Sequence, residues 1–238
     1  MELVLGFVIC LIGSMIQGAM GFGYAIFCMA LLPLFIPFKV AAAVVLLSSF
    51  MMLIQMVYRL RDHINIKLMF GPTVFSFAGS TVGIYILMHY PEALLKMILG
   101  LVLVLLSVYL AFYNQKIKMK ASVKNGMIAG LISGISGGIS NIDGPPLVIY
   151  YFSAASDKME YHATIQSTFL IGGLYSILLH ISYGNINERV LELAGAAVVA
   201  VLLGSYIGLK IFAKLKRHML NKLIYFFMAV MGMILMLK

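Results

Sequence analysis

Long apolar runs alternate with short polar interruptions along this chain of 238 residues, and their spacing predicts its helices. One helical crossing of a lipid bilayer needs about 20 apolar residues. Apolar runs of about this length occur near residues 39–58, 66–88, 92–113, 162–183, 188–211 and 218–237. The pattern therefore predicts six membrane-spanning helices, in two groups of three.

An apolar block that glycine and proline interrupt precedes each group. The first block runs from the N-terminus to Phe38 and is broken at Gly18–Gly23, and the second covers about residues 122–155. Each block is too short for two comfortable crossings joined by a turn. We therefore expect a pair of short helices in each, meeting at a glycine-rich tip inside the protein, where surrounding protein or a wet cavity must cover the non-helical backbone.

The order of one broken block and three spans occurs twice, and short motifs recur with it. The matching pairs are Gly18–Gly21 with Gly134–Gly137, Ser48–Phe50 with Ser167–Phe169, and Gly79–Ile84 with Gly204–Leu209. The offset between the members of a pair grows along the chain, from 116 residues (18 to 134) to 125 residues (79 to 204). Slowly growing offsets are typical of a diverged internal duplication. We expect a first membrane repeat at residues 1–113, a basic connector at 114–124 and a second repeat at 125–238.

The number of crossings sets the relation between the repeats. A broken block ends on the side where it began and three spans follow, so each repeat crosses an odd number of times and the second is inverted. The expected fold class is an all-α integral membrane protein with two inverted-topology repeats, each a broken, half-helix hairpin plus three transmembrane helices. Secondary transporters have this architecture, with their sites near the bilayer midplane.

Composition and charge agree with a membrane environment. Apolar residues make up 63% of the chain, charged residues 11%, and the mean hydropathy is +1.05, against about 45–50% and about 25% in soluble domains. Thirteen Lys and Arg residues fall on one predicted side and four on the other. The positive-inside rule makes the first side cytoplasmic, so both termini are expected outside the cytoplasm. Membrane lipids, and no nucleic acid, are the expected partners of the basic residues.

The two breaks favour an anion site. The first turn of a helix presents free N–H groups and a partial positive charge. Half-helices that begin near Gly21–Tyr24 and Gly144–Leu147 could direct such ends at one central cavity and hold an anion without a buried Lys or Arg. Hydroxyls near mid-depth either line this cavity or bond the preceding turn of their own helix; these are Ser48, Ser49, Ser167 and Thr168.

Asp143 directly precedes the Gly-Pro-Pro sequence that begins at Gly144, and its carboxylate has three interpretations. It caps the second half-helix, a role in which Asp is common; it binds a proton or cation during transport, as intramembrane carboxylates often do; or it occupies a solvated loop position. Cys10 and Cys28 both lie in apolar segments, which argues against a disulfide framework or a cysteine-based metal site. No metal or other cofactor is expected.

Two stretches carry a resemblance to a known family. GSMIQGAMGFGYAIFCMALLPLF, from Gly13, resembles the Gly-x-x-Gly-Phe-Gly opening of the TauE/SafE family of anion exporters. GISGGISNIDGPPLVIYYF, from Gly134, followed by the Ala163–Thr168 helix, resembles that family's Gly-x-x-Gly-Gly and Gly-Pro-Pro signature. The resemblance covers essentially the whole chain and implies a secondary transporter that moves small anions such as sulfite, sulfoacetate or related sulfonates outward.

The expected substrate-binding residues combine the family's glycine-rich tips with the polar residues beside them. They are Gly18, Gly21, Phe22, Gly23, Tyr24, Ser48, Ser49, Gly137, Gly138, Asn141, Gly144, Pro145, Ser167 and Thr168. The family usually has small residues where this chain has Asn141 and Asp143. A carboxylate repels an anion unless it is protonated or paired, and a proton-coupled carrier would reconcile the two.

Two other functions stay open. A passive anion channel could use the same residues as a carrier. An intramembrane lipid-phosphate enzyme is less favoured, because it would need clustered carboxylates and Asp143 is the one carboxylate near mid-membrane. The sequence is therefore expected to encode a transporter rather than an enzyme, working as a monomer or a homodimer.

Overall fold

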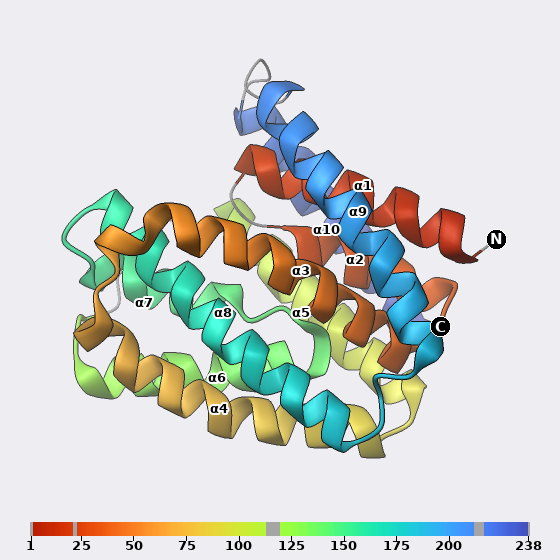
Figure 1. The fold of residues 1–238 in the computed structure, drawn as a ribbon, viewed down its shortest axis with the longest axis horizontal. Helices are drawn as coiled ribbons and strands as arrows, with labels where there is room; N and C mark the ends of the chain where they lie inside the picture. Colours follow the sequence, from red (N-terminus) through yellow and green to blue (C-terminus); the bar gives the residue numbers. More distant parts are fainter. Residues whose placement is uncertain (1, 21–22, 113–119, 212–216, 238) are drawn as a thin grey trace. The chain divides into compact units, whose positions relative to one another are not determined.

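The computed structural model describes residues 2–20, 23–112, 120–211 and 217–237, and over these ranges the chain is helical (Figure 1). The α-helices are α1 (Glu2–Met20), α2 (Tyr24–Leu31), α3 (Phe38–Leu60), α4 (Ile66–His89), α5 (Glu92–Phe112), α6 (Val123–Ser140), α7 (Gly144–Ala154), α8 (Lys158–Ser182), α9 (Glu188–Ile211) and α10 (Arg217–Leu237). Two 3₁₀ turns, η1 (Leu32–Leu34) and η2 (Arg61–His63), follow α2 and α3. The all-α prediction is confirmed for this part of the chain.

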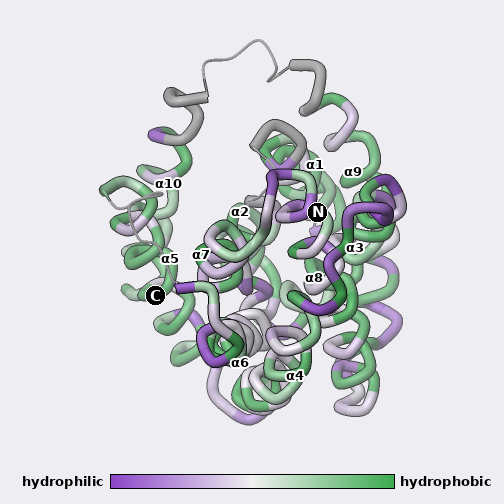
Figure 2. Tube along the Cα trace, turned by 90° about the vertical axis from the view of Figure 1, so that its left-hand side faces the viewer, coloured by the Kyte–Doolittle hydropathy of each residue, from purple (hydrophilic) through white to green (hydrophobic). Residues whose placement is uncertain are grey.

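Five of the described helices are long and apolar enough to cross a membrane. They are α3 extended by η2, α4, α5, α8 and the part of α9 up to Gly208, and apolar positions extend along much of their length (Figure 2). The sixth predicted span, 218–237, is helix α10, whose described side chains begin at Lys222 and form a shorter apolar helix. The chain is therefore a multi-pass membrane protein, as its composition predicts.

Both predicted breaks occur, and the helix that follows each one starts where the sequence indicates. α2 begins at Tyr24 and α7 at Gly144. The first helix of each block is longer than the second: α1 has 19 residues and α6 has 18, or about 27–29 Å of helix, and neither is among the five long apolar spans. The second helices have 8 residues in α2 and 11 in α7.

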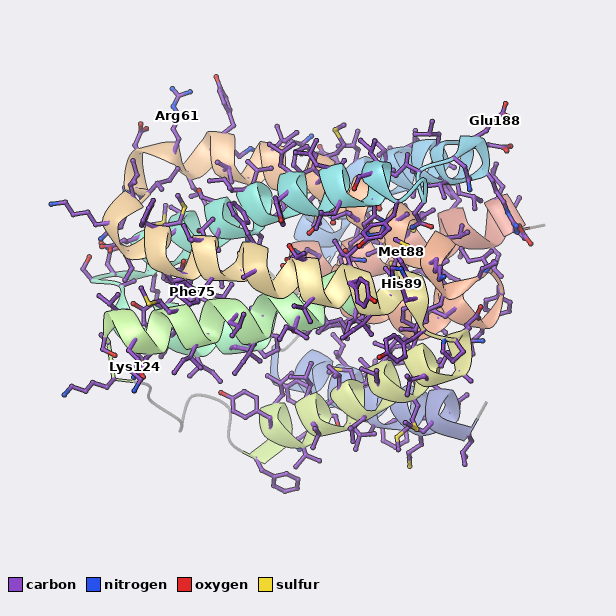
Figure 3. The ribbon with its side chains drawn as sticks, turned by 90° about the horizontal axis from the view of Figure 1, so that it is seen from below. Arg61, Phe75, Met88, His89, Lys124 and Glu188 are labelled. Carbon is purple, nitrogen blue, oxygen red and sulfur yellow. The ribbon has the colours of Figure 1, made fainter. Side chains whose placement is uncertain are left out.

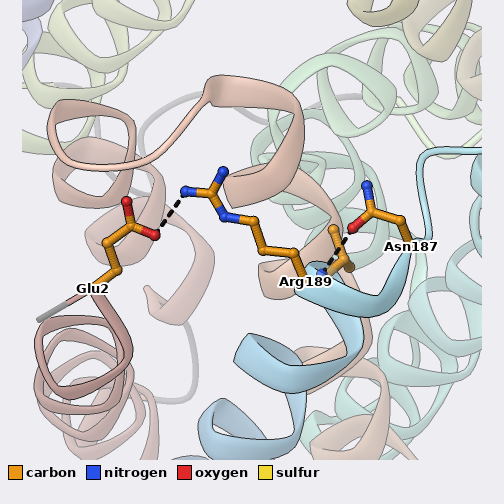
Figure 4. A network of polar contacts seen from close by, with 4 residues as sticks. Glu2, Asn187 and Arg189 are labelled. Carbon is orange, nitrogen blue, oxygen red and sulfur yellow. Dashed lines mark hydrogen bonds and ion pairs between the residues drawn. The ribbon is translucent and has the colours of Figure 1, made fainter.

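Side-chain caps explain why three of the later helices begin where they do. Ser122 accepts from the Asn125 amide at the start of α6, at 3.2 Å, and Asn187 accepts from the Val190 amide at the start of α9, at 3.0 Å (Figure 4). Asp157 caps α8 by accepting from the amides of Met159 and Glu160, at 2.7 and 2.9 Å. The Glu160 and Met159 amides hold the pKa of the Asp157 carboxyl below its usual range.

The chain packs as two units, and each unit takes helices from both halves of the sequence. Unit 1 contains Met1–Ser49, Tyr90–Asn114 and Asn185–Lys238, and unit 2 contains Phe50–His89 and Gln115–Gly184. In unit 1, α1 packs on α9 and α5 on α10; in unit 2, α4 packs on α6 and α8. The predicted division into two sequential repeats with a connector at 114–124 describes the order along the chain. The packing units do not test it, so it stays a prediction.

Glycine lets α6 approach α4 closely in unit 2. A Cβ atom on Gly134 would lie 2.8 Å from the backbone nitrogen of Ser80, and one on Gly138 would lie 2.8 Å from the Ser80 carbonyl oxygen. Gly130 faces the Pro72 backbone in the same way. Each interior glycine destabilises a helix by about 1 kcal/mol relative to alanine. The same small residues allow the backbones of two helices to pack directly against each other.

The α1–α9 contact of unit 1 repeats the α4–α6 contact of unit 2. The glycines and the backbone they face are Gly79 with Leu131, Gly83 with Ile135, Gly204 with Leu11, and Gly208 with Met15. Taken as equivalent contacts, these pairs relate α1 to α6 by 120 residues (11 to 131, 15 to 135). The starts of α2 and α7 (24, 144) and of α3 and α8 (38, 158) have the same offset.

This offset corrects the alignment made from the sequence. Gly18 corresponds to Gly138 rather than to Gly134, and Ser48 corresponds to Thr168 rather than to Ser167. The error has a physical cause: glycine recurs every fourth residue along α6, from residue 126 to residue 138, so a shift by one helical turn matches the glycine motif equally well.

Candidate functional site

The first break lies in unit 1, between α1 and α2. Gly23 precedes α2 with φ 115° and ψ −9°, a conformation that only glycine adopts at low cost. The amide of Tyr24, the first residue of α2, donates to the side-chain oxygen of Gln17 at 2.9 Å. The next amides, of Ala25 and Ile26, belong to the group that a helix start leaves without an intrahelical partner. Gly21 and Phe22 lie outside the described residues.

Tyr24 also connects α2 to the next membrane span. Its hydroxyl lies 2.6 Å from Oγ of Ser48 on α3, and the tyrosine is 1% exposed. Ser48 donates its own proton to the Val44 carbonyl at 2.6 Å, so the tyrosine is the donor in the pair. Ser49 donates to the Leu46 carbonyl at 3.0 Å. The two hydroxyls of α3 that were predicted to line the site therefore both donate to backbone carbonyls of their own helix.

The second break lies in unit 2, between α6 and α7. Asn141 ends α6 in the left-handed conformation, with φ 57°, and its amide donates to the Gly137 carbonyl at 2.7 Å. Asparagine is a common alternative to glycine at such a helix end. Pro145 and Pro146 take two of the first four positions of α7 and carry no N–H. The amides available in this first turn are those of Gly144 and Leu147.

Asp143 occupies the N-cap position of α7, as the sequence predicts, but its carboxylate makes no capping hydrogen bond. Its backbone carbonyl instead accepts a hydrogen bond from the hydroxyl of Ser133 on α6. The Asp143 side chain lies over Gly137, where an added Cβ atom would come within 2.7 Å of the Asp143 Cβ. Gly137 therefore makes room for the carboxylate, and the proton-binding role stays a prediction.

The second unit repeats the tyrosine contact with different residues. The hydroxyl of Tyr151 on α7 lies 2.8 Å from Oγ1 of Thr168 on α8, and Thr168 donates to the Thr164 carbonyl at 3.0 Å. Ser167 donates to the Ala163 carbonyl at 2.8 Å. In each unit a tyrosine of the short helix thus donates to a hydroxyl of the following span, which donates to its own backbone.

Tyr151 is not among the binding residues expected from the sequence, and sequence reasoning did not identify this contact. Tyr24 is the first residue of its helix and Tyr151 the eighth, so the 120-residue offset does not pair them. Their partners, Ser48 and Thr168, are equivalent at the 120-residue offset. The available signal in the sequence was a tyrosine in each short helix together with hydroxyl residues at equivalent positions of the following spans.

We expect Tyr151→Phe to lower the free energy of unfolding by about 1 kcal/mol, the usual net value of one hydrogen bond, and to leave transport unchanged. The reason is that both hydroxyls of this pair are used within the protein. Equilibrium unfolding in mixed micelles of Tyr151→Phe, Thr168→Val and the double variant measures the coupling between them. Loss of transport in Tyr151→Phe at unchanged stability would instead identify the tyrosine as a substrate contact.

The start of α7 has open space in front of it. A Cβ atom on Gly144 would meet no other atom within 4 Å, outside its own helix and chain neighbours, and Gly144 and Pro145 are partly buried. A ligand could therefore approach the backbone of this turn closely. Within the described residues, no three His, Cys, Asp or Glu side chains lie together in a way that could hold a metal ion.

Several charged side chains lie at helix ends, unlike Asp143, which lies at the second break. In unit 2, Arg61 and Lys124 lie at one end of the helices and His89 toward the other (Figure 3). In unit 1, Arg189 on α9 pairs with Glu2 on α1 at 2.6 Å, and both side chains are about half exposed (Figure 4). Exposed pairs of this kind contribute little to stability.

Five long apolar helices and two interrupted blocks define a multi-pass membrane protein, and interrupted helices are a feature of transporters. Comparison with known protein families matches residues 5–235 to the family described as sulfite exporter TauE/SafE. The chain belongs to this family of membrane transporters. It is therefore not an enzyme, and the resemblance seen in the sequence is confirmed. Searches of curated proteins and of solved structures returned no match.

Proposed function

We propose that this chain is a secondary transporter that exports small sulfur oxyanions or organic sulfonates, with sulfite and sulfoacetate as the representative substrates. The observation that carries the proposal is the family match over residues 5–235. The two helix breaks support it, because they offer backbone amides to an anion without requiring a buried Lys or Arg.

Each break is proposed to be an anion contact in its own unit. The short helices support a position near mid-depth: Tyr24–Leu34 and α7 each have 11 residues. At 1.5 Å per residue this is about 16 Å, or half of a hydrocarbon core about 30 Å thick. The amides of Ala25 and Ile26 in unit 1, and of Gly144 and Leu147 in unit 2, are the proposed donors.

The two halves are proposed to be inverted repeats. Helix order is the same in both halves, and the offset is 120 residues over the broken blocks and the following span. The α1–α9 and α4–α6 contacts exchange helices between the halves in matching ways. In this arrangement both termini face away from the cytoplasm. Reporter fusions at either terminus that are active only in the cytoplasm would contradict this topology.

Asp143 is proposed to couple anion transport to protons. We expect Asp143→Asn to abolish any stimulation of transport by acidic pH while the protein stays folded. Asparagine has nearly the same shape, and the Ser133 hydroxyl bonds the Asp143 backbone rather than its side chain. The measurement is the initial rate of sulfite uptake by proteoliposomes at an acidic and an alkaline pH.

Asp62→Asn is the matched control for this variant, since the Asp62 side chain is 84% exposed and at the end of the α3 span. It should keep the wild-type pH dependence. If Asp143→Asn also keeps that dependence, Asp143 has no coupling role and occupies the N-cap position for structural reasons alone.

Counterflow tests the transport proposal itself. Proteoliposomes loaded with unlabelled sulfite are placed in trace labelled sulfite, and a carrier accumulates the label transiently because exchange is faster than net flux. We expect saturable counterflow of sulfite and of sulfoacetate, and none of acetate. Flux that neither saturates nor shows counterflow would identify an anion channel, and no flux of any sulfur anion would overturn the proposed substrates.

A further inference from the structure

Gln166 on α8 carries a buried amide oxygen, Oε1, that has no hydrogen-bond partner among the described residues. The residue is 4% exposed. Most buried polar atoms in proteins are hydrogen-bonded, and each exception requires an explanation. An unpaired buried acceptor lowers the stability of the fold, and such a cost is commonly retained where a site serves function.

The polar residues around Gln166 along α8 are all satisfied within the protein. Thr164 accepts from the Asn65 amide at 3.1 Å, Ser167 donates to the Ala163 carbonyl, and Thr168 joins the Tyr151 pair. Gln166 therefore differs from its neighbours, although all of them are buried. The segment predicted to line the site does contain an unpaired polar group, but it is this glutamine rather than the predicted hydroxyls.

An amide oxygen can only accept a hydrogen bond, which restricts the ligand that would satisfy it. A fully deprotonated anion brings only acceptors and would leave Oε1 unpaired, whereas an anion with its own O–H or N–H group would pair with it. A site built around such a contact rejects analogues that lack the donor, because the buried polar group is then left unpaired.

We infer that Gln166 is a specificity-determining substrate contact, which accepts a hydrogen bond from a donor group on the transported anion. The inference rests on the proposed function and narrows its substrate class to sulfur anions with a proton to donate. Hydrogensulfite is one, and sulfonates with a hydroxyl group or with a protonated carboxyl group, as in singly charged sulfoacetate, are others. Sulfonates with a purely hydrocarbon substituent are disfavoured.

The test uses two substrates that differ by one hydroxyl group, 2-hydroxyethanesulfonate and ethanesulfonate. Initial rates in proteoliposomes give kcat/KM for each with the wild type, Gln166→Leu and Gln55→Leu. Gln55 is an exposed glutamine on α3, so Gln55→Leu makes the same chemical change outside the interior. We expect the wild type and Gln55→Leu to prefer the hydroxylated substrate by about tenfold or more, and Gln166→Leu to show a ratio near one.

Thermal unfolding of the same purified variants provides a second readout, because a binding role and a structural role of Gln166 predict opposite changes in stability. Because leucine removes an unpaired buried polar group, Gln166→Leu should unfold about 2–4 °C above the wild type, the shift expected for about 1 kcal/mol in a chain of this size. A purely structural glutamine, held by a buried water molecule, would make the same variant less stable.

The outcomes separate this inference from the function on which it rests. A gain in stability together with loss of the hydroxyl preference supports it. An unchanged substrate ratio in Gln166→Leu, or a wild-type ratio near one, overturns the inference and leaves the transporter proposal intact. If the wild type moves neither sulfonate and also fails to move sulfite, both the proposed function and the inference are overturned.

Discussion

Gly134→Ala is expected to lower the free energy of unfolding by about 3 kcal/mol, at the upper end of the range for overpacked interiors. The added Cβ atom would lie 2.8 Å from the Ser80 nitrogen and 2.9 Å from the Ser76 carbonyl carbon, and it would overlap the Ser76 oxygen. These are backbone atoms of α4, so no side-chain rotation relieves the contact. The two helices must separate, which also loosens the packing of Gly130 and Gly138.

Gly195→Ala is the matched control. Gly195 lies within α9, is exposed, and has no atom within 4 Å of an added Cβ. Alanine favours a helix over glycine by about 1 kcal/mol, so this variant should be as stable as the wild type or slightly more so. Equilibrium unfolding in mixed micelles measures both. Equal stability of Gly134→Ala and wild type would contradict the close α4–α6 contact.

Gly23→Ala is expected to reduce transport about tenfold or more while the protein still inserts into the membrane. The backbone of Gly23 has φ 115° and ψ −9°, and a residue with a Cβ atom in such a conformation costs about 1–3 kcal/mol. A change at Gly23 displaces the start of α2, including the Tyr24 amide that Gln17 holds. If this strain disfavours the transport-competent arrangement by about 1.4 kcal/mol, the transport rate already falls about tenfold.

Gly184→Ala separates this effect from general backbone strain. Gly184 also has a positive φ, 67°, but follows α8 in a connection between spans and has open space around its Cβ position. It should lose some stability and keep its transport rate per inserted molecule. Initial sulfite uptake, normalised to protein recovered from the proteoliposomes, compares the two. Normal transport by Gly23→Ala would mean that the first break has no role in function.

Local chemistry made the helix breaks predictable from the sequence. Only glycine suits the backbone at Gly23, and the two prolines after Gly144 suit a first helical turn. The starts of α2 and α7 follow from these residues. The lengths of α1 and α6 did not follow, because interior glycines resemble a helix break in the sequence. Their packing against Pro72, Ser76 and Ser80 of α4, far away along the chain, keeps α6 helical.

The polar contacts of the site were less predictable than the breaks, since they depend on which side chains meet. Ser48, Ser49, Ser167 and Thr168 were expected at the site, and the structure has all four bonding their own helices. Hydroxyls in apolar helices have this option of bonding the preceding turn, so their presence alone does not indicate a ligand. The side-chain oxygen of Gln166 has no hydrogen-bond partner among the described residues, and only a structure reveals this.

Protection of a single introduced thiol by sulfoacetate, which unlike sulfite does not react with maleimides, tests the central claim of anion binding at a helix break most directly. Gly144→Cys places the thiol at the start of α7, where an added Cβ meets no other atom, and Cys10 and Cys28 are buried and give little background. The measurement is the rate of maleimide labelling with increasing sulfoacetate, with Lys120→Cys, at an exposed position shortly before α6, as control. Binding at the break predicts slower labelling of Gly144→Cys, saturating with the KM for transport, and unchanged labelling of Lys120→Cys. Labelling of Gly144→Cys that stays constant at sulfoacetate concentrations that saturate transport would contradict the account.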